Sequence, residues 1–253
     1  LEQVPIIQQN STTTGISWIR KFKEKKGQFI LALSTNKLKN IFSRYVDNEN
    51  LNGLYFRNDS HEWETKLRLK TVNYVNDWKI SWGGNIQYSD YFNNTSDLYN
   101  QAEYITKFNF YKYGLFGNIS KSFFENKLDL SIGIRSDEDT FSNGSKLKNN
   151  LSPRLSTSLS ISKDRRLKWN SSLGSYYKIP VYTVLGFKNS LGEFANQDAK
   201  YTRSNHFVTG FDYALGNASK ISVEGFLKKY DQFPISVFDG VSLANKGADF
   251  EVL

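Results

Sequence analysis

Apolar residues recur at every second position along most of this chain, and that period limits the possible folds more than any other feature. Trp78, Ile80, Trp82, Gly84, Ile86 and Tyr88 alternate with Lys79, Ser81, Gly83, Asn85, Gln87 and Ser89. Residues 63–70, 128–135 and 154–161 repeat the pattern. Successive side chains of a strand point to opposite faces, whereas a helix would need a period near 3.6. The sequence therefore predicts an all-β chain whose strands each have one apolar and one polar face.

The breaks between the alternating runs have two sizes, which follow each other along the chain. Short polar turns are expected at residues 24–27, 75–77, 125–127, 164–166 and 216–219. Long polar connections are expected at residues 47–60, 91–101, 137–152, 182–201 and 231–245. Short turns at one end and long loops at the other are typical of an antiparallel outer-membrane barrel. We predict about ten strands and a partial eleventh near residues 248–253.

Composition excludes several other classes of protein. The chain contains no cysteine, so disulfide scaffolds, thiolate zinc sites and cysteine nucleophiles are excluded. It contains no methionine, which predicts either a processed chain or a piece of a longer protein. The net charge of +8 comes from basic residues scattered along the chain, so nucleic-acid binding is not expected. No apolar stretch approaches the roughly 18 residues of a membrane-spanning helix.

Aromatic placement favours a membrane barrel over a soluble β-sandwich, which also alternates apolar and polar residues. Trp78 and Trp169 stand beside short turns, and Tyr88 and Tyr177 follow on the same faces. Ten residues of a tilted strand climb roughly 25 Å, the height of a barrel's apolar band between two aromatic girdles. The opposite face carries serine, glycine, asparagine and charged residues, which suit a water-filled lumen better than a core. The alternative, a soluble carbohydrate-binding β domain, would enclose the apolar face.

The segment 150–187, NLSPRLSTSLSISKDRRLKWNSSLGSYYKIPVYTVLGF, resembles part of the barrel of TonB-dependent outer-membrane receptors. Its Ser-Pro-Arg opening at residues 152–154 and the Tyr-x-x-Pro of Tyr177 and Pro180 carry the resemblance. Residues 113–135, which end in Gly-Ile-Arg, are similar to the hairpin that precedes this segment in the family. A later strand of the family begins with residues similar to Asn245, Lys246, Gly247 and Glu251. About two thirds of the chain is covered, and the family's plug domain and final strands are absent from it.

The resemblance implies a fold, a function and a set of partners. Residues 1–253 would be an interior segment, 10–11 strands of a transmembrane β-barrel of roughly 22 strands. The whole protein would sit in the bacterial outer membrane, with lipid and lipopolysaccharide outside it and its own plug domain within. TonB would power the import of a bulky nutrient such as a siderophore, oligosaccharide or peptide. A surface lipoprotein is a further expected partner, and neither enzyme activity nor a cofactor is implied.

A passive channel, or a structural barrel of an outer-membrane complex, remains the main alternative, because both would use the same wall without energy coupling. Candidate ligand-binding residues are the inward-pointing positions near the external end of the strands. There, aromatic rings would stack on sugars or siderophore rings, and charged groups would pair with ligand or plug. These residues are Tyr91, Arg135, Asp137, Arg154, Tyr176 and His206. A metal site is not expected, because His61 and His206 are far apart in the sequence.

Overall fold

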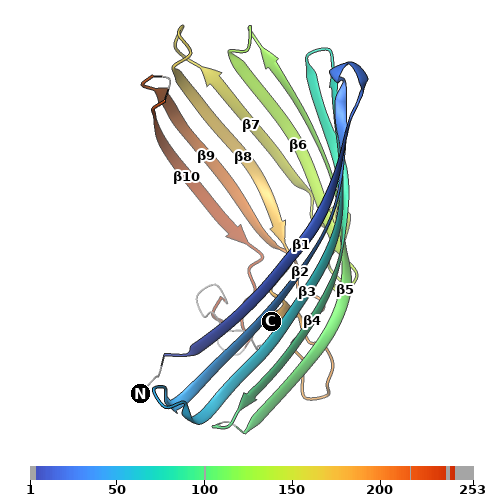
Figure 1. The fold of residues 1–253 in the computed structure, drawn as a ribbon, viewed down its shortest axis with the longest axis vertical. Coiled ribbons are helices and arrows are strands. Elements are labelled where there is room, and N and C mark those ends of the chain that lie inside the picture. The colour runs from blue at the N-terminus through green and yellow to red at the C-terminus, as the bar shows by residue number, and fades with distance from the viewer. Residues whose placement is uncertain (1–3, 100, 217, 238–239, 243–253) are drawn as a thin grey trace.

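The computed structural model describes residues 4–99, 101–216, 218–237 and 240–242, and within them the chain is all-β. Ten strands form one antiparallel sheet in which each strand pairs with its neighbours in sequence (Figure 1). The strands are β1 (Ile6–Lys21), β2 (Gly27–Asp47), β3 (Asn52–Val75), β4 (Trp78–Asp97), β5 (Ala102–Phe123), β6 (Leu128–Asp139), β7 (Ser152–Ser160), β8 (Leu167–Lys178), β9 (Thr202–Ala214) and β10 (Lys220–Asp231). The predicted fold class and strand number are confirmed, and the partial strand expected near residues 248–253 lies outside the described residues.

Helices contribute little to the described structure. The α-helix α1 (Tyr182–Leu185) and the 3-10 helices η1 (Lys23–Lys25) and η2 (Leu147–Asn149) are each a single short turn. No helix in the described residues has the length and apolar character needed to cross a membrane. The function of the chain must therefore be sought on the sheet and on the connections between its strands.

Four of the predicted short turns, and residues 216, 218 and 219 of the fifth, lie together at one end of the sheet, the upper end in Figure 1; residue 217 lies outside the described residues. The β3–β4 turn at residues 76–77 is the tightest of them. Asn76 takes a positive φ of 53°, a conformation that asparagine tolerates better than most residues. The Ser-Pro-Arg segment opens β7, and Tyr-x-x-Pro closes β8, as expected.

Two of the predicted long connections are wrong. Residues 47–60 and 91–101 are largely strand, because β2 pairs with β3 as far as Asp47↔Asn52 and β4 pairs with β5 as far as Asp97↔Ala102. Their composition resembles that of a loop because most of their residues are polar. At about 3.3 Å per residue and a tilt near 40°, strands of this length climb roughly 55 Å, about twice the apolar band.

The two faces of the sheet differ as the alternation predicts. Trp82 and Ile132 lie on the outer face, with exposed fractions of 51% and 64%. On the inner face of β4, by contrast, Ser89, Tyr91 and Asn93 are almost completely buried. The expectation that the apolar side is the open outer wall is thus confirmed, and a soluble body that encloses this side is not what the chain forms.

Aromatic residues mark two levels of the outer face. Trp18 and Trp78 lie near the short turns, and both are exposed. Further along the strands, the rings of Tyr88 and Tyr111 are 5.3 Å apart on neighbouring strands β4 and β5. Two such levels are the arrangement of aromatic girdles at the interfaces of a lipid bilayer.

Candidate functional site

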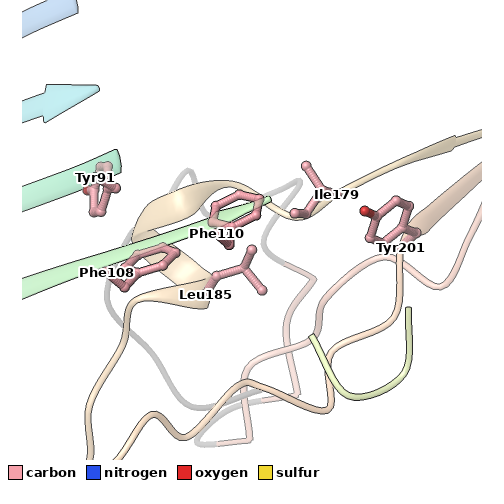
Figure 2. Close-up of a cluster of buried hydrophobic side chains, with 6 residues drawn as sticks. All are labelled: Tyr91, Phe108, Phe110, Ile179, Leu185 and Tyr201. Carbon is pink, nitrogen blue, oxygen red and sulfur yellow. The ribbon is translucent and has the colours of Figure 1, made fainter. Parts of the chain in front are cut away.

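The connection between β8 and β9, residues 179–201, folds against the inner face of β4 and β5. We call it the docked loop. Its α1 segment places Leu185 against Phe108 and Phe110 of β5, as Figure 2 shows. Tyr91 of β4 and Tyr201, the last residue of the loop, complete the same buried cluster. The apolar core of the described structure is therefore formed between a loop and the barrel wall.

Hydrogen bonds fix the middle of the docked loop to β5. The hydroxyls of Tyr104 and Thr106 both donate to the carbonyl oxygen of Gly186, at 2.6 and 2.8 Å. The backbone N–H of Lys188 donates to the Tyr104 hydroxyl at 2.7 Å. Within the loop, Asn196 Nδ2 donates to the Val184 carbonyl at 2.8 Å. Since a buried polar group without a partner is costly, these bonds favour one position of the loop.

Two tyrosines connect the docked loop to carboxylates of the wall. Tyr182 donates to Glu64 Oε1 of β3 at 2.5 Å, and Tyr201 donates to Asp139 Oδ2 of β6 at 2.9 Å. Burial, reinforced by the nearby carboxylate, raises the pKa of both tyrosines well above the ordinary value. Both hydroxyls therefore keep their protons, and remain donors, throughout the neutral pH range.

Two cavities border the α1 segment. The first, of about 580 Å³, lies on the β8–β10 side, and Val184 of α1 forms part of its wall. Its lining is mainly aromatic and apolar and includes Tyr176, His206, Tyr230, Phe233, Pro180 and Pro234. We call it the aromatic cavity. The second, of about 730 Å³, lies on the β2–β4 side and is lined by Thr183, Tyr91, Arg44 and Glu62 among others. Both volumes are in the range of small-molecule sites.

The structure brings three of the six predicted site residues into one contiguous group. The guanidinium of Arg154 lies 4.5 Å from the ring centroid of Tyr176, and the rings of Tyr176 and His206 are 4.6 Å apart. Ser204 Oγ is 2.6 Å from His206 Nε2. Because β7, β8 and β9 are adjacent, residues from three separate segments form one inward-facing row.

The other three predicted residues have different surroundings. Arg135 forms a two-point contact with Asp137, with its Nε and Nη2 each 2.6 Å from a carboxylate oxygen. Arg135 Nη2 also donates to Asn85 Oδ1 at 3.1 Å. Tyr91 is almost fully buried against the docked loop, with its ring 5.8 Å from that of Tyr182. All six side chains lie on the inner face, as predicted, but they do not form a single site. Arg154, Tyr176 and His206 form the row, Arg135 and Asp137 form an ion pair, and Tyr91 packs against the docked loop.

Sequence reasoning missed the wall residues that hold the docked loop, chiefly Tyr104, Phe108 and Phe110. A signal for them was present in β5. The large apolar residues of that strand lie mostly at even positions up to Phe110 and mostly at odd positions from Tyr111 onwards, with Ile105 and Phe116 as the exceptions. The pairing of β5 with β4 has no register shift there, so the change of phase is a change of face. Going from the short turns toward the external end of β5, this change of face marks the level at which apolar side chains stop facing outward and start facing the docked loop.

A curved antiparallel sheet with girdles outside and a loop docked inside defines a wall of an outer-membrane β-barrel. No known family's sequence profile matches the chain, and no curated protein matches it in sequence. Solved structures do match. The copper transporter OprC is 14% identical, with a TM-score of 0.64, over 87% of this chain and 40% of its own.

Two further matches have similar values. The ferric enterobactin receptor PfeA of Pseudomonas aeruginosa is 12% identical over 88% of this chain and 35% of its own, with a TM-score of 0.64. The outer-membrane transporter YddB of Escherichia coli is 12% identical over 88% of this chain and 35% of its own, with a TM-score of 0.59. The chain thus has the fold of the barrel of TonB-dependent receptors and spans 35–40% of the length of these structures.

Proposed function

We propose that this chain is part of the barrel wall of a TonB-coupled outer-membrane receptor that imports a bulky nutrient. The nutrient would be a siderophore, an oligosaccharide or a peptide, and residues 1–253 would be one partial barrel domain. Two findings support the partial barrel: the shared fold, and the strands β1 and β10, which each pair on one side only among the described residues. In a membrane such edges need further strands, because unpaired backbone groups are costly in lipid.

The docked loop is the observation that carries the proposal. A passive channel conducts through an open lumen, whereas this wall holds 23 residues of connection across its inner face. The loop is buried at Leu185, hydrogen-bonded at Gly186, and borders a cavity that contains Tyr176 and His206. A loop held against the inner face of the wall, beside an aromatic cavity, supports a receptor that binds its ligand first and transports it only when driven.

The partners follow from the same proposal. Outer-membrane lipid and lipopolysaccharide would contact the outer face, where Trp82 and Ile132 are exposed. The protein's own plug domain would occupy the lumen below the docked loop, and TonB would act on that plug. A surface lipoprotein would contact the external connections. The row of Arg154, Tyr176 and His206 would bind the ligand, with aromatic stacking as its main contribution.

Uptake by cells that express the full-length protein tests this function. A panel of ferric siderophores, maltooligosaccharides and short peptides should reveal one that accumulates, and collapse of the proton-motive force should stop its accumulation. Tyr176→Ala should reduce uptake about tenfold, whereas Tyr99→Ala, at an exposed tip between β4 and β5, should not. Uptake that persists after the collapse would support the passive channel instead.

A further inference from the structure

The outer face of β1 to β4 carries a pocket of about 360 Å³ near the external end of these strands, the lower end in Figure 1. We call it the outer-wall pocket. Two of its lining residues, Leu38 and Glu62, alternate with the others and face the lumen. The outward-facing lining residues are Asn10 and Thr12 of β1, Lys37 and Lys39 of β2, His61 and Trp63 of β3, and Asp90 of β4.

Strand pairing arranges these side chains in two rows just beyond the external aromatic girdle. The first row is Thr12, Lys37, Trp63 and Asp90, and the second is Asn10, Lys39 and His61. Asp90 follows the girdle residue Tyr88 by two positions on the same face of β4, which is about 7 Å along the strand. The outer-wall pocket therefore lies where the headgroups of the external leaflet meet the wall.

Lys37 is held in place by an aromatic ring rather than by a carboxylate. Its ammonium lies 4.5 Å from the ring centroid of Trp63. The ring is itself fixed, because Trp63 Nε1 donates to Thr35 Oγ1 at 2.9 Å. Lys37 pairs with no carboxylate among the described residues, so its charge is available to an anion while its position is already restricted.

Lys39 shares its carboxylate with other basic side chains. Its Nζ and Nη2 of Arg57 each lie 3.8 Å from Asp59 Oδ2, and His61 Nε2 lies 3.1 Å from the other carboxylate oxygen. One carboxylate cannot neutralise two permanent cations. Together with Lys37, this group leaves the lysine side of the outer-wall pocket with an excess of positive charge.

The opposite side of the outer-wall pocket has a different chemistry. Asp90 supplies a carboxylate, which accepts hydrogen bonds but does not donate them. Asn10 and Thr12 offer both donors and acceptors beside the lysines. An isolated phosphate would meet repulsion from Asp90, whereas a phosphate joined to hydroxyl groups matches both sides. The lining therefore favours a phosphorylated sugar.

We propose that the outer-wall pocket binds the phosphorylated sugar headgroup of lipopolysaccharide. Lys37 and Lys39 would contact a phosphate, and Asp90 would accept hydrogen bonds from sugar hydroxyls. Charge complementarity selects the headgroup, and its level beyond the girdle selects a lipid as its source. This inference rests on the proposed function, which places the wall in the outer membrane, and it assigns the lipid partner to one site on that wall.

Titration of the delipidated full-length protein with three lipids, in a neutral detergent at low ionic strength, tests the inference. The lipids are lipid A with two phosphates, monophosphoryl lipid A, and phosphatidylglycerol, which is anionic but has no sugar. Native mass spectrometry gives the affinity for each. The wild type should bind lipid A with two phosphates about fivefold more tightly than either of the others, an effect typical of an exposed charge pair. Added salt should reduce this preference.

Variants separate the outer-wall pocket from general charge effects. Lys37→Gln combined with Lys39→Gln should bring the three affinities within about twofold of one another. Asp90→Ala should weaken both forms of lipid A about threefold without weakening phosphatidylglycerol. Lys107→Gln is the matched control. Lys107 is exposed on the outer face of β5 at the level of Lys39 but lies outside the pocket, so its replacement should change no affinity.

Each contrary result has a definite meaning. Equal affinity of the wild type for the three lipids, or equal losses in the Lys107 variant and the double lysine variant, overturns this inference. Phosphatidylglycerol bound as tightly as lipid A with two phosphates, with the same dependence on the lysines, overturns the sugar assignment. In each case, nutrient uptake that still requires the proton-motive force would leave the proposed function standing. A full-length protein that stays in solution without detergent and binds none of the lipids contradicts both.

Discussion

Replacing Leu185 by alanine should release the docked loop while the sheet stays folded. Leu185 has an exposed fraction of 0% and packs among the aromatic rings that β4 and β5 present to the loop. Truncation of a buried leucine costs about 2–5 kcal/mol, from lost burial plus the cavity left behind. The ladder between β4 and β5 does not involve Leu185, so this cost falls on docking of the loop.

Hydrogen exchange measures this cost directly. The N–H groups of Gly186 and Ala195 donate to backbone carbonyls within the loop, at 2.8 and 3.0 Å, and exchange when the loop opens. A loss of 2 kcal/mol corresponds to roughly 25-fold faster exchange, and larger losses to more. Mass spectrometry of peptides spanning residues 186–196, from the full-length protein in detergent, gives the rates.

Leu191→Ala is the matched control. Leu191 lies in the same loop with an exposed fraction of 80%, so its truncation removes little burial. Exchange in this variant should remain within about threefold of the wild type. If Leu185→Ala also left the exchange rates unchanged, or if both variants accelerated exchange to the same extent, the packing of Leu185 would not be what holds the docked loop.

Two further predictions concern the wall itself. Gly114→Ala should lower the free energy of unfolding by about 1–3 kcal/mol, because its Cβ would overlap the Asp137 carboxylate. Gly117→Ala is the matched control: it lies on the outer face of the same strand, where a Cβ meets no atom within 4 Å, so its effect on the free energy of unfolding should be close to zero. Urea unfolding in detergent would compare the two, and equal stability would count against the ion pair's packing role. Ile132→Arg on the outer face should cost about 2–4 kcal/mol in a bilayer, and Ser131→Arg on the inner face much less. Heat-induced mobility shifts of protein folded in liposomes would measure both; a reversed order would mean that the faces are assigned wrongly.

Much of the wall was predictable because a strand places alternate residues on opposite faces without reference to anything distant. The run from Trp78 to Tyr88 specified an apolar outer face, and the polar turns specified where the chain reverses. Inward positions such as Arg154 and Tyr176 followed from the same parity. Their assembly into one row with His206 did not, because it depends on which strands are neighbours and in what register.

Polar composition misled at the external ends of β2 to β5. Residues 47–60 and 91–101 resemble loops, yet most of them continue the ladder. A strand above the apolar band has water on its outer side, so it loses the apolar alternation that identifies a strand. Backbone pairing continues regardless, because it does not depend on the side chains being apolar.

The sequence by itself determined the all-β class, the two faces, the short turns and the inward direction of the candidate residues, since these depend on local periodicity. Only the tertiary structure decided that residues 179–201 fold inward, that Leu185 packs in one cluster with Phe108 and Phe110, and that Arg68, Lys70 and Arg154 surround one hollow. The physical reason is that burial and electrostatic repulsion depend on distances between segments far apart in the chain, and those distances exist only once the sheet has curved.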